Sequence, residues 1–588
     1  MNGKIMMITR LLKLFFKKNL HLLAMILLLL FSAILAALGP IVLGQITDIV
    51  WDGVKNHAIR FDLFFPLLIT VFFIYLGEYF THWGAGWISI HIVSNASHDL
   101  RQQIEEKIWK LPLIYFDQNS RGDILSRVTN DIDNITEIFS QTMTDLIYFI
   151  LMIVGVVFMM FVLSWQLALI TLTTILLFII IFIIIMKVSG PYFKKQRKSI
   201  GIINSKVEET VVGQTLIKVY GQEEKFKDNF NQENQKLYND SFKAEFISQI
   251  IIPVTDFVTN LNYVIVALIG GLQILSGQMT LGQVQAFIQY VHQFSQPLAD
   301  IAEIINLLQS AFASAERVFD LLDSEEEISD SYLPQTKEST EGLIEFKDVS
   351  FSYDLNIKLI KNMNLVANPG QTVAIVGSTG AGKTTLVNLI MRFYEVNKGL
   401  ISLDGKNISE MSRATSRLSI GMVLQDTWLF NGTIEENIKY GLQEGKKISH
   451  KEFMESTKSA YVDNFVSYLP EGYKTVLNDD NSSISVGEKQ LITIARLFLS
   501  NPDILILDEA TSSVDTRTEI LIQKAMRALH SKCTSFVIAH RLSTIRNADK
   551  IIVMDKGKIV EQGSHNELIK SEGHYSKLYQ SQFEGFEL

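Results

Sequence analysis

The sequence has 588 residues, of which 48% are hydrophobic and 20% are charged, and its formal net charge is −9. This length suits several domains, since about 100–200 residues per domain is usual. The acidic balance argues against a nucleic-acid partner, which would need a basic face. The single cysteine, Cys533, excludes a disulfide framework within the chain and fits a reducing compartment.

The first half of the chain contains long runs without Asp, Glu, Lys or Arg. Residues 22–46 form the first run, and about 20 apolar residues are enough for a helix to cross the hydrocarbon core. The hydrophobic region of a secretory signal has only about 7–15 residues, so this run predicts a membrane helix. A second span is expected near residues 64–92, where Glu78 interrupts the run. The basic and apolar segment Ile8–Leu20 is typical of an interfacial helix lying on the inner leaflet.

Two further uncharged runs are each too long for a single span. Residues 146–186 would reach about 60 Å as one helix, twice the thickness of the hydrocarbon core. They therefore predict two helices with a turn near Ser164. Residues 257–299 divide in the same way at the SGQMTLGQ stretch that begins at Ser276, so six spans are expected in all.

Two polar excursions with a helical pattern, roughly 98–137 and 187–245, interrupt the apolar runs. Lys and Arg are abundant in the second excursion and in the N-terminal RLLKLFFKK run, whereas the turns near Ser164 and Ser276 have none. Positive residues next to helix ends mark the cytoplasmic side. Both termini and both excursions are therefore expected in the cytoplasm.

Polar side chains inside the predicted spans are costly in lipid, so each needs a partner or a function. They could line a polar cavity, or they could hydrogen-bond one helix to the next, and the sequence leaves both possibilities open. The residues concerned are Glu78, Asp256, Asn260, His292, Gln293 and Gln296.

The remainder of the chain has the composition of a soluble α/β domain. An acidic, loop-like stretch over Ser324–Gly342 has linker composition. It sets the predicted boundaries at residues 1–323 for the membrane part and 343–588 for the soluble part. Directly after the linker, LIEFKDVSFSYD alternates like a pair of strands.

The run VAIVGSTGAGKTT places an apolar strand directly before a glycine-rich loop that opens a helix. Glycines let backbone N–H groups approach phosphates closely, and the helix N-terminus adds a favourable dipole. Lys383 would reach the β and γ phosphates, and Thr384 would hold Mg²⁺. A second buried strand, ILILDEA, ends in Asp508, which suits the Mg²⁺ shell, and Glu509 follows. The sequence therefore predicts a site for ATP and Mg²⁺.

Five segments occur in the order found in ATP-binding-cassette (ABC) exporters, and the chain resembles a half-transporter of that family over essentially its whole length. They are GSTGAGKTT from Gly377, VLQD around Gln425, ISVGEKQ from Ile484, ILILDEA from Ile504 and IAHR around His540. The resemblance implies a six-helix transmembrane domain followed by an α/β P-loop ATPase domain. It also implies that the segments YFDQNSRGDILSRVTND and TVVGQTLIKVYGQEEKF contact the ATPase domain.

The resemblance also assigns roles at the nucleotide site. Glu509 would orient or deprotonate the attacking water, His540 would contact the γ-phosphate, and Gln425 would link Mg²⁺ and water to the membrane loops. Tyr353 would stack on adenine, and Asp515 would reach across to a partner chain. The ligands would be Thr384, Gln425 and Asp508 for Mg²⁺, and Gly377, Ser378, Thr379, Gly380, Ala381, Gly382, Lys383, Thr384 and Thr385 for the phosphates.

One segment departs from the family pattern, because ABC exporters normally read LSGGQ where this chain reads ISVGEKQ. Ser485 and Gly487 remain as the expected contacts to a partner's ATP, but Val486 and Glu488 stand where the family has Gly and Gln. A branched side chain hinders close backbone approach, and two like charges about 4 Å apart repel by about 4 kcal/mol at an effective dielectric near 20. A homodimer with two weakened sites and a heterodimer remain open, and the retained Glu509 favours the heterodimer.

The expected function is ATP-driven export of an amphipathic compound, drug-like or lipid-like, across the cytoplasmic membrane. The expected partners are a second half-transporter, non-identical and with an intact LSGGQ, the lipid bilayer and the amphipathic cargo, with no nucleic acid. The chain resembles the subunit of a heterodimeric multidrug-type exporter that retains its catalytic glutamate. The alternatives are an ATP-gated channel or sensory regulator on the same scaffold, and a homodimeric lipid flippase.

Overall fold

The computed structural model describes two compact units, which are treated separately below. The helical unit comprises Met1–Lys110 with Asn119–Ser324, and the α/β unit comprises Leu111–Gln118 with Glu325–Leu588. The residues described are 2–15, 19–330, 341–354, 359–424, 427–442, 445–478, 484–508, 514–530, 533–538 and 545–583.

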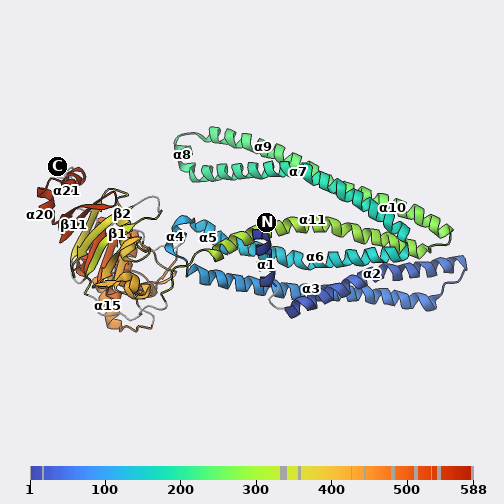
Figure 1. Ribbon diagram of the computed structural model, residues 1–588, viewed down its shortest axis with the longest axis horizontal. Helices are drawn as coiled ribbons and strands as arrows, with labels where there is room; N and C mark the ends of the chain where they lie inside the picture. Colours follow the sequence, from blue (N-terminus) through green and yellow to red (C-terminus); the bar gives the residue numbers. More distant parts are fainter. Residues whose placement is uncertain are drawn as a thin grey trace. The chain divides into compact units, whose positions relative to one another are not determined.

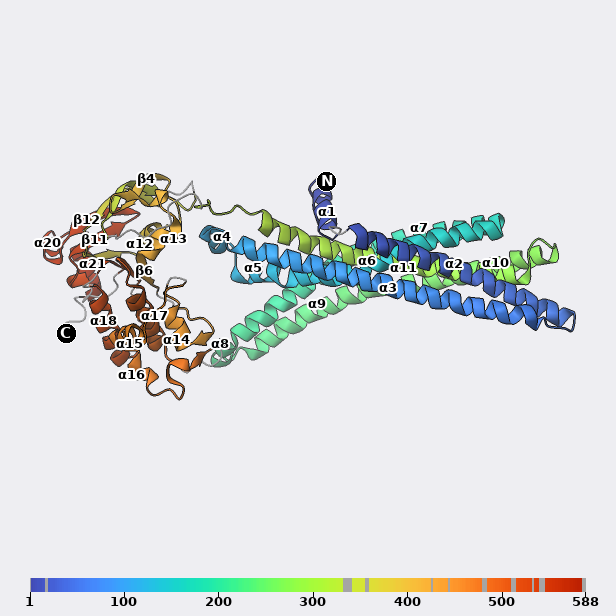
Figure 2. The same cartoon turned by 90° about the horizontal axis from the view of Figure 1, so that it is seen from below.

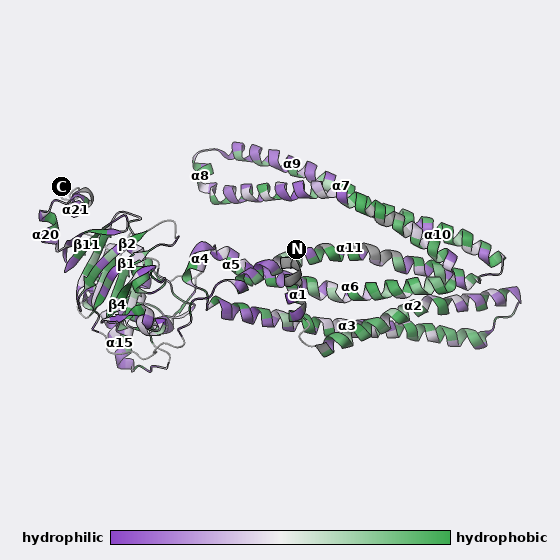
Figure 3. Ribbon diagram, in the orientation of Figure 1, coloured by the Kyte–Doolittle hydropathy of each residue, from purple (hydrophilic) through white to green (hydrophobic). Residues whose placement is uncertain are grey.

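Helices, most of them long, build the helical unit (Figure 1). In chain order they are α1 (Asn2–Phe15), α2 (Asn19–Lys55), α3 (Phe61–Ile108), α5 (Arg121–Val128), α6 (Asn130–Leu163), α7 (Trp165–Val212), α8 (Gln214–Val219), α9 (Glu223–Gln249), α10 (Ile251–Leu275) and α11 (Leu281–Asp323). The two polar excursions predicted from the sequence are thus helical, and they continue membrane helices such as α3 and α7 beyond their apolar parts. Figure 3 shows this change along α7, which is hydrophobic near α10 and hydrophilic near α8.

The predicted turns between paired spans are confirmed. Ser164 separates α6 from α7 and caps α7, since its hydroxyl accepts a hydrogen bond from the Leu167 amide. Ser276 follows the last residue of α10, and α11 begins at Leu281. Among the described residues, four stretches are long and apolar enough to cross a membrane: Leu20–Lys55, Phe61–Ile108, Arg121–Leu163 and Asp256–Leu275. The other two predicted spans fall in α7 and α11, where some side chains are outside the description, so the count of six stays a prediction.

The first helix packs on protein through Leu11 and Phe15. Leu11 is 1% exposed and Phe15 is 6% exposed, and the Phe15 ring stacks on Phe139 of α6 with 4.4 Å between the centroids. Arg10 pairs with Asp323 of α11 at 2.7 Å. Leu11 and Phe15 therefore face protein, whereas Leu20 is 76% exposed. The interpretation of Ile8–Leu20 as an interfacial helix stays a prediction.

Two of the polar residues in the predicted spans form hydrogen bonds between helices. The Tyr148 hydroxyl of α6 donates to the Glu78 carboxylate of α3 at 2.9 Å, and the Gln293 amide of α11 donates to the Ala36 carbonyl of α2 at 3.4 Å. Such bonds hold helices together where lipid offers no alternative partner. The side chains of three others are exposed in this chain: Asp256, Asn260 and His292. The side chain of Gln296 lies outside the description.

The α/β unit contains a six-stranded sheet of order β12-β11-β3-β10-β9-β6 and a four-stranded sheet of order β2-β1-β4-β5. The strands are β1 (Ile344–Phe351), β2 (Ile360–Ala367), β3 (Thr372–Gly377), β4 (Lys398–Leu403), β5 (Lys406–Asn407), β6 (Ile420–Val423), β7 (Gly432–Thr433), β8 (Val476–Leu477), β9 (Ile504–Asp508), β10 (Thr534–Ile538), β11 (Lys550–Asp555) and β12 (Lys558–Gly563). The expected strand pair within LIEFKDVSFSYD is wrong, because this stretch contributes the single strand β1 and its antiparallel partner is β2.

The α/β unit also contains helices. They are α4 (Leu113–Gln118), α12 (Lys383–Ile390), α13 (Arg413–Leu418), α14 (Ile434–Lys439), α15 (His450–Ser459), α16 (Asp463–Val466), α17 (Val486–Ser500), α18 (Thr516–His530), α20 (His565–Lys570) and α21 (His574–Phe583). Figure 2 shows α14, α15, α16 and α17 gathered on the side away from β4. Short 3-10 turns occupy Ile408–Glu410 and Gly472–Lys474.

The central strand β3 separates two hydrophobic cores. Val373 and Ile375 belong to the core shared with β1, β2 and α12, whereas Ala374 and Val376 belong to the core shared with α17 and α18. Successive side chains of a strand point to opposite faces of its sheet, so both faces of β3 must be apolar. Burial of both faces is typical of parallel sheets, and β3 pairs in parallel with β10 and β11.

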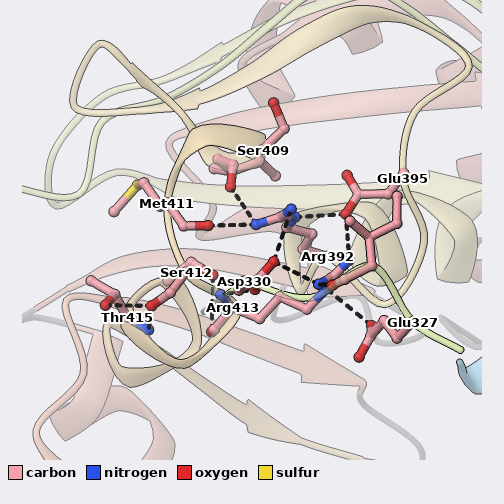
Figure 4. Close-up of polar contacts among 12 residues, drawn as sticks. Glu327, Asp330, Arg392, Glu395, Ser409, Met411, Ser412, Arg413 and Thr415 are labelled. Carbon is pink, nitrogen blue, oxygen red and sulfur yellow. Dashed lines mark hydrogen bonds and ion pairs between the residues drawn. The ribbon is translucent and has the colours of Figure 1, made fainter. Parts of the chain in front are cut away.

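The first residues after α11 are fixed to the α/β unit by an arginine cluster, which comprises Glu327, Asp330, Arg392, Glu395 and Arg413 (Figure 4). Arg413 donates to Asp330 and to Glu395, each at 2.8 Å, and its Nε lies 2.9 Å from Glu327. Arg392 donates to Glu395 at 2.8 Å. This part of the predicted linker is therefore bound to the surface of the α/β unit.

Candidate nucleotide-binding site

The glycine-rich loop joins the end of β3 to the start of α12. A β-carbon at Gly377 would lie 2.3 Å from the carbonyl oxygen of Met554, which no real side chain tolerates. Gly380 and Gly382 have φ angles of 80° and 101°, a region that glycine enters without strain. The chain therefore forms the tight loop that the sequence predicts, and the loop ends at the N-terminus of α12.

Lys383 lies folded over this loop. Its side chain donates hydrogen bonds to the carbonyls of Gly377 at 2.8 Å and Ser378 at 3.1 Å. Burial lowers the pKa of Lys383, and the nearby charge of Asp508 opposes that effect. The two hydrogen bonds of this buried ammonium go to neutral carbonyls, and an ammonium bonds more strongly to an anion, so this position suits the phosphates of a nucleotide.

Two neighbouring threonines at the start of α12 face different surroundings. Thr384 is exposed, and Thr385 is 5% exposed. The Thr385 hydroxyl accepts a hydrogen bond from the Tyr353 hydroxyl at 3.4 Å. The Thr384 hydroxyl is therefore open to a metal ion, whereas the Thr385 hydroxyl is bonded to the hydroxyl of Tyr353.

The residues expected to hold Mg²⁺ supply suitable oxygen atoms. Asp508 ends β9, and its position pairs with Ile538 of β10 in the parallel sheet. A carboxylate and a hydroxyl are hard oxygen ligands of the kind that Mg²⁺ prefers, so Asp508 and Thr384 fit this ion. The third predicted ligand, Gln425, lies outside the described residues.

Tyr353 is held beside α12 with part of its ring open. Its ring is packed edge-on against Phe351 and Tyr394, with 4.9 Å between the centroids in both cases. The Asn388 amide donates to its hydroxyl at 3.3 Å. Tyr353 remains 40% exposed, so part of its side chain is accessible to a ligand. Sequence reasoning missed Tyr394 and Asn388, since neither belongs to a recognised segment.

The ISVGEKQ segment begins α17 with a capping box. The Ser485 hydroxyl accepts from the Glu488 amide at 3.3 Å, and the Glu488 carboxylate accepts from the Ser485 amide at 2.6 Å. Glu488 therefore turns back onto its own helix end, a role that the Ser-x-x-Glu spacing signals but that sequence reasoning missed. A Gln at this position would cap in the same way without a charge.

Gly487 and Val486 have different surroundings at this helix start. A β-carbon at Gly487 would lie 2.5 Å from Cγ2 of Thr518 and 2.7 Å from Cγ1 of Val514. Gly487 therefore allows α17 and α18 to pack closely. Val486 is 50% exposed, so its branched side chain is presented to solvent at the first position of the helix.

Asp515 caps α18. Its carboxylate accepts hydrogen bonds from the amides of Arg517 and Thr518, both at 3.0 Å. The Thr518 amide is the main cause of the lowered pKa of Asp515, so the carboxylate is held ionised at the helix end. The three predicted catalytic residues lie outside the described part of the chain and stay predictions: Gln425, Glu509 and His540.

A glycine-rich phosphate loop in a parallel α/β unit, on the same chain as a unit of long apolar helices, defines a membrane-spanning ATPase. Residues 22–298 match the family model of the ABC transporter transmembrane region, and residues 360–512 match the model described as ABC transporter. The chain belongs to the ABC transporter family. It is a multi-pass membrane protein whose ABC ATPase domain binds ATP and is coupled to transport. One membrane region and one ATPase domain make it a half-transporter, which implies a dimer partner.

Several named relatives align with most of the chain. A "Fatty acid ABC transporter ATP-binding/permease protein" of Mycobacterium tuberculosis is 52% identical over 479 residues, which cover 82% of this chain and 75% of the relative. An "ATP-dependent lipid A-core flippase" of Syntrophus aciditrophicus is 36% identical over 95% of this chain and 92% of the relative. A "Probable multidrug resistance ABC transporter ATP-binding/permease protein YheH" of Bacillus subtilis is 34% identical over 90% of this chain and 77% of the relative. ATP-driven export is therefore the activity of this family of chains.

Proposed function

We propose that this chain is one half of a heterodimeric exporter in the cytoplasmic membrane, with both termini and the α/β unit in the cytoplasm. It would bind ATP and Mg²⁺ on its own phosphate loop and hydrolyse ATP with Glu509, assisted by His540 and Gln425. The partner would supply an intact LSGGQ segment over that nucleotide. Ser485, Gly487 and Asp515 would in turn face the nucleotide of the partner.

The observation that carries this proposal is the start of α17. Helix N-termini attract anions through free amides and the helix dipole. Here the Glu488 carboxylate accepts from the Ser485 amide at 2.6 Å, so a negative charge already lies at the helix end. Val486 adds a branched, half-exposed side chain beside it. Both features weaken the attraction for a phosphate, which supports an asymmetric pair in which this clamp is the poorer one.

The names of the relatives and the composition of the spans support a cargo class. The relatives are named for a fatty acid, the lipid A core and multidrug resistance, and these names support an amphipathic cargo, either lipid-like or drug-like. Long helices with few charges also favour a cargo that enters from lipid. A fatty acid is the first compound to test, because the relative named for it is 52% identical.

The proposal is tested by transport in proteoliposomes. Glu509→Gln in the assembled transporter should abolish most ATP turnover and labelled fatty-acid transport while ATP binding remains, because only the predicted base is lost. Glu471→Gln, which changes an exposed acid of the same unit, is the control and should leave turnover unchanged. Turnover of Glu509→Gln within about twofold of wild type would contradict the catalytic assignment.

The heterodimer is tested by repairing the clamp. Val486→Gly with Glu488→Gln should tighten nucleotide retention on the partner's phosphate loop, because it removes a side chain and a repulsive charge without adding a base. Trapped labelled ATP identifies the chain that retains it. Increased retention only on this chain's own loop, or full transport by a purified homodimer, would contradict the proposal. Passive current without ATP-driven accumulation would instead support a channel on the same scaffold.

A further inference from the structure

The end of α11 is fixed within the helical unit. The Arg10 guanidinium of α1 bonds the carboxylate of Asp323, the last residue of α11, at 2.7 Å, and it lies 4.4 Å from the centroid of the Phe319 ring. The Ser324 hydroxyl donates a hydrogen bond to the Asp320 carbonyl at 2.8 Å. The chain is therefore held on the helical unit as far as Ser324, where this unit ends.

Three residues further along, Glu327 belongs to the arginine cluster of the α/β unit (Figure 4). Its carboxylate lies 2.9 Å from Nε of Arg413, and Arg413 also donates to the Ile328 carbonyl at 2.7 Å. Asp330 accepts from the Arg413 amide at 2.7 Å and from its guanidinium at 2.8 Å. The side chains of Arg413 and Asp330 are only 9% and 16% exposed, and opposite charges attract more strongly away from water. The segment Glu327–Asp330 is therefore an anchor of the chain on the α/β unit.

The anchor is also bonded to the stretch that follows the helix of the phosphate loop. Helix α12 begins at Lys383 and ends at Ile390, and Arg392 comes two residues later. The Arg392 guanidinium lies 3.7 Å from the Asp330 carboxylate and donates to Glu395 at 2.8 Å. The anchor therefore lies next to the C-terminal end of α12, whose N-terminal end carries the phosphate loop.

The connection between Ser324 and Glu327 is short. It consists of three peptide steps, which span at most about 10–11 Å when fully extended. Helix α11 runs without a break over 43 residues, so a displacement of its end is passed along the helix toward the sixth predicted span. A displacement of the α/β unit that exceeds the reach of this connection has to be followed by α11.

We propose that the anchor makes residues 325–326 a short tether, through which the ATP-driven movement of the α/β unit displaces α11. Glu327, Asp330 and Arg413 are then positioning residues for coupled transport, since they act through α11 and not on the nucleotide. This role needs ATP-driven transport, whatever the cargo. The length of chain between Ser324 and Glu327 alone, and not the length of the whole linker, then sets how much transport each hydrolysed ATP drives.

The first test lengthens the tether and leaves the residues of the anchor unchanged. Eight Gly and Ser residues inserted between Ser324 and Glu325 raise the r.m.s. reach of a flexible connection from about 10 Å to about 18 Å. In proteoliposomes, the assembled transporter should keep ATP turnover within about twofold of wild type, since no group of the nucleotide site changes. It should lose most labelled fatty-acid transport per ATP. The same insertion between Gln335 and Thr336, beyond the anchor in the chain, is the control and should transport like wild type.

The second test measures the tether without a cargo. Spin labels on Glu316→Cys of α11 and Lys398→Cys of β4, both exposed positions, report one distance by electron paramagnetic resonance of the full chain in nanodiscs. Cys533→Ser removes the buried native thiol. The insertion after Ser324 should broaden the distribution of this distance by up to about 8 Å, which is the added reach, whereas the insertion after Gln335 should not.

The charge of the anchor is tested with the same two labels. Asp330→Asn keeps the shape of the side chain and removes its charge, so it should broaden the distance distribution and lower transport per ATP. Glu325→Gln removes an exposed acid of the tether itself and should leave both unchanged. A loss of stability alone would lower ATP turnover and transport together and would not change the transport per ATP.

Transport per ATP that equals wild type after the insertion at Ser324 overturns the tether, whether or not the distance distribution broadens. Equal losses for the two insertions overturn the role of the anchor, because the length of the whole linker would then decide. If the wild-type transporter carries no fatty acid, the proposed cargo is wrong and the spin-label distance decides alone. Broadening by the insertion after Ser324, without broadening by the insertion after Gln335, then supports the tether, and any other pattern overturns it.

Discussion

Replacing Asp330 by Ala is expected to destabilise the α/β unit strongly, although Asp330 lies in a stretch with linker composition. Its carboxylate accepts from the Arg413 amide at 2.7 Å and from the Arg413 guanidinium at 2.8 Å. It also lies 3.7 Å from the guanidinium of Arg392. The side chains of Arg392 and Arg413 are 5% and 9% exposed, so water cannot replace the lost carboxylate well.

The size of the destabilisation by Asp330→Ala follows from the burial of these charges. Removal of one partner from a buried ion pair costs about 3–5 kcal/mol, because the other charge stays buried without compensation. The Asp330 side chain is itself 16% exposed, and Glu327 and Glu395 remain, so we expect about 3 kcal/mol. A change of 1 kcal/mol in the free energy of unfolding shifts the melting temperature of a domain of this size by about 2–4 °C. The unfolding transition of the α/β unit should therefore fall by about 6–12 °C.

Differential scanning calorimetry of the full chain in nanodiscs measures this shift, and the transition of the α/β unit is the one that ATP raises. Glu325→Ala is the control, since it removes an exposed acid from the same segment, and its shift should stay below about 2 °C. Equal shifts for Asp330→Ala and Glu325→Ala would refute the reasoning, because the cluster would then contribute nothing beyond net charge.

Gly487→Ala should destabilise the α/β unit by about 1–3 kcal/mol, because its β-carbon would lie 2.5 Å from Thr518. Val486→Ala is the control for it in thermal unfolding, and equal losses would contradict the close packing of α17 on α18. Burial lowers the pKa of His530 to about 4 from 6.5, so the folded state stays neutral where the unfolded chain takes up a proton. The contribution of neutral His530 to the free energy of unfolding is then fully present above about pH 6.5 and is lost as pH falls toward 4. At pH 5 the free energy of unfolding is lower by about 2 kcal/mol. His530→Gln should flatten this dependence in calorimetry, and an unchanged slope would contradict it. Lys383→Met should weaken ATP binding about tenfold or more in titrations with little change in melting temperature, and unaltered affinity would exclude its role at the phosphates.

The sequence by itself determined the elements whose formation depends on neighbouring residues. The turns near Ser164 and Ser276 follow from the length of uncharged runs, since a helix longer than the hydrocarbon core has to turn. The phosphate loop follows from glycine spacing after an apolar strand, because only glycine permits the tight loop at Gly377. These signals are local, and the structure forms them where the patterns predict.

The tertiary structure alone decided the contacts between distant segments. Asp117 and Tyr394 are separated by 277 residues, and Asp330 and Arg413 by 83 residues, and no periodicity in the sequence relates them. The contact of Phe15 with Phe139 has the same origin, because Phe139 covers Phe15 only after the chain has folded. The residue type determines whether a side chain favours burial or a hydrogen bond. The packing of distant elements determines its partner, since burial and hydrogen bonding depend on which surfaces meet.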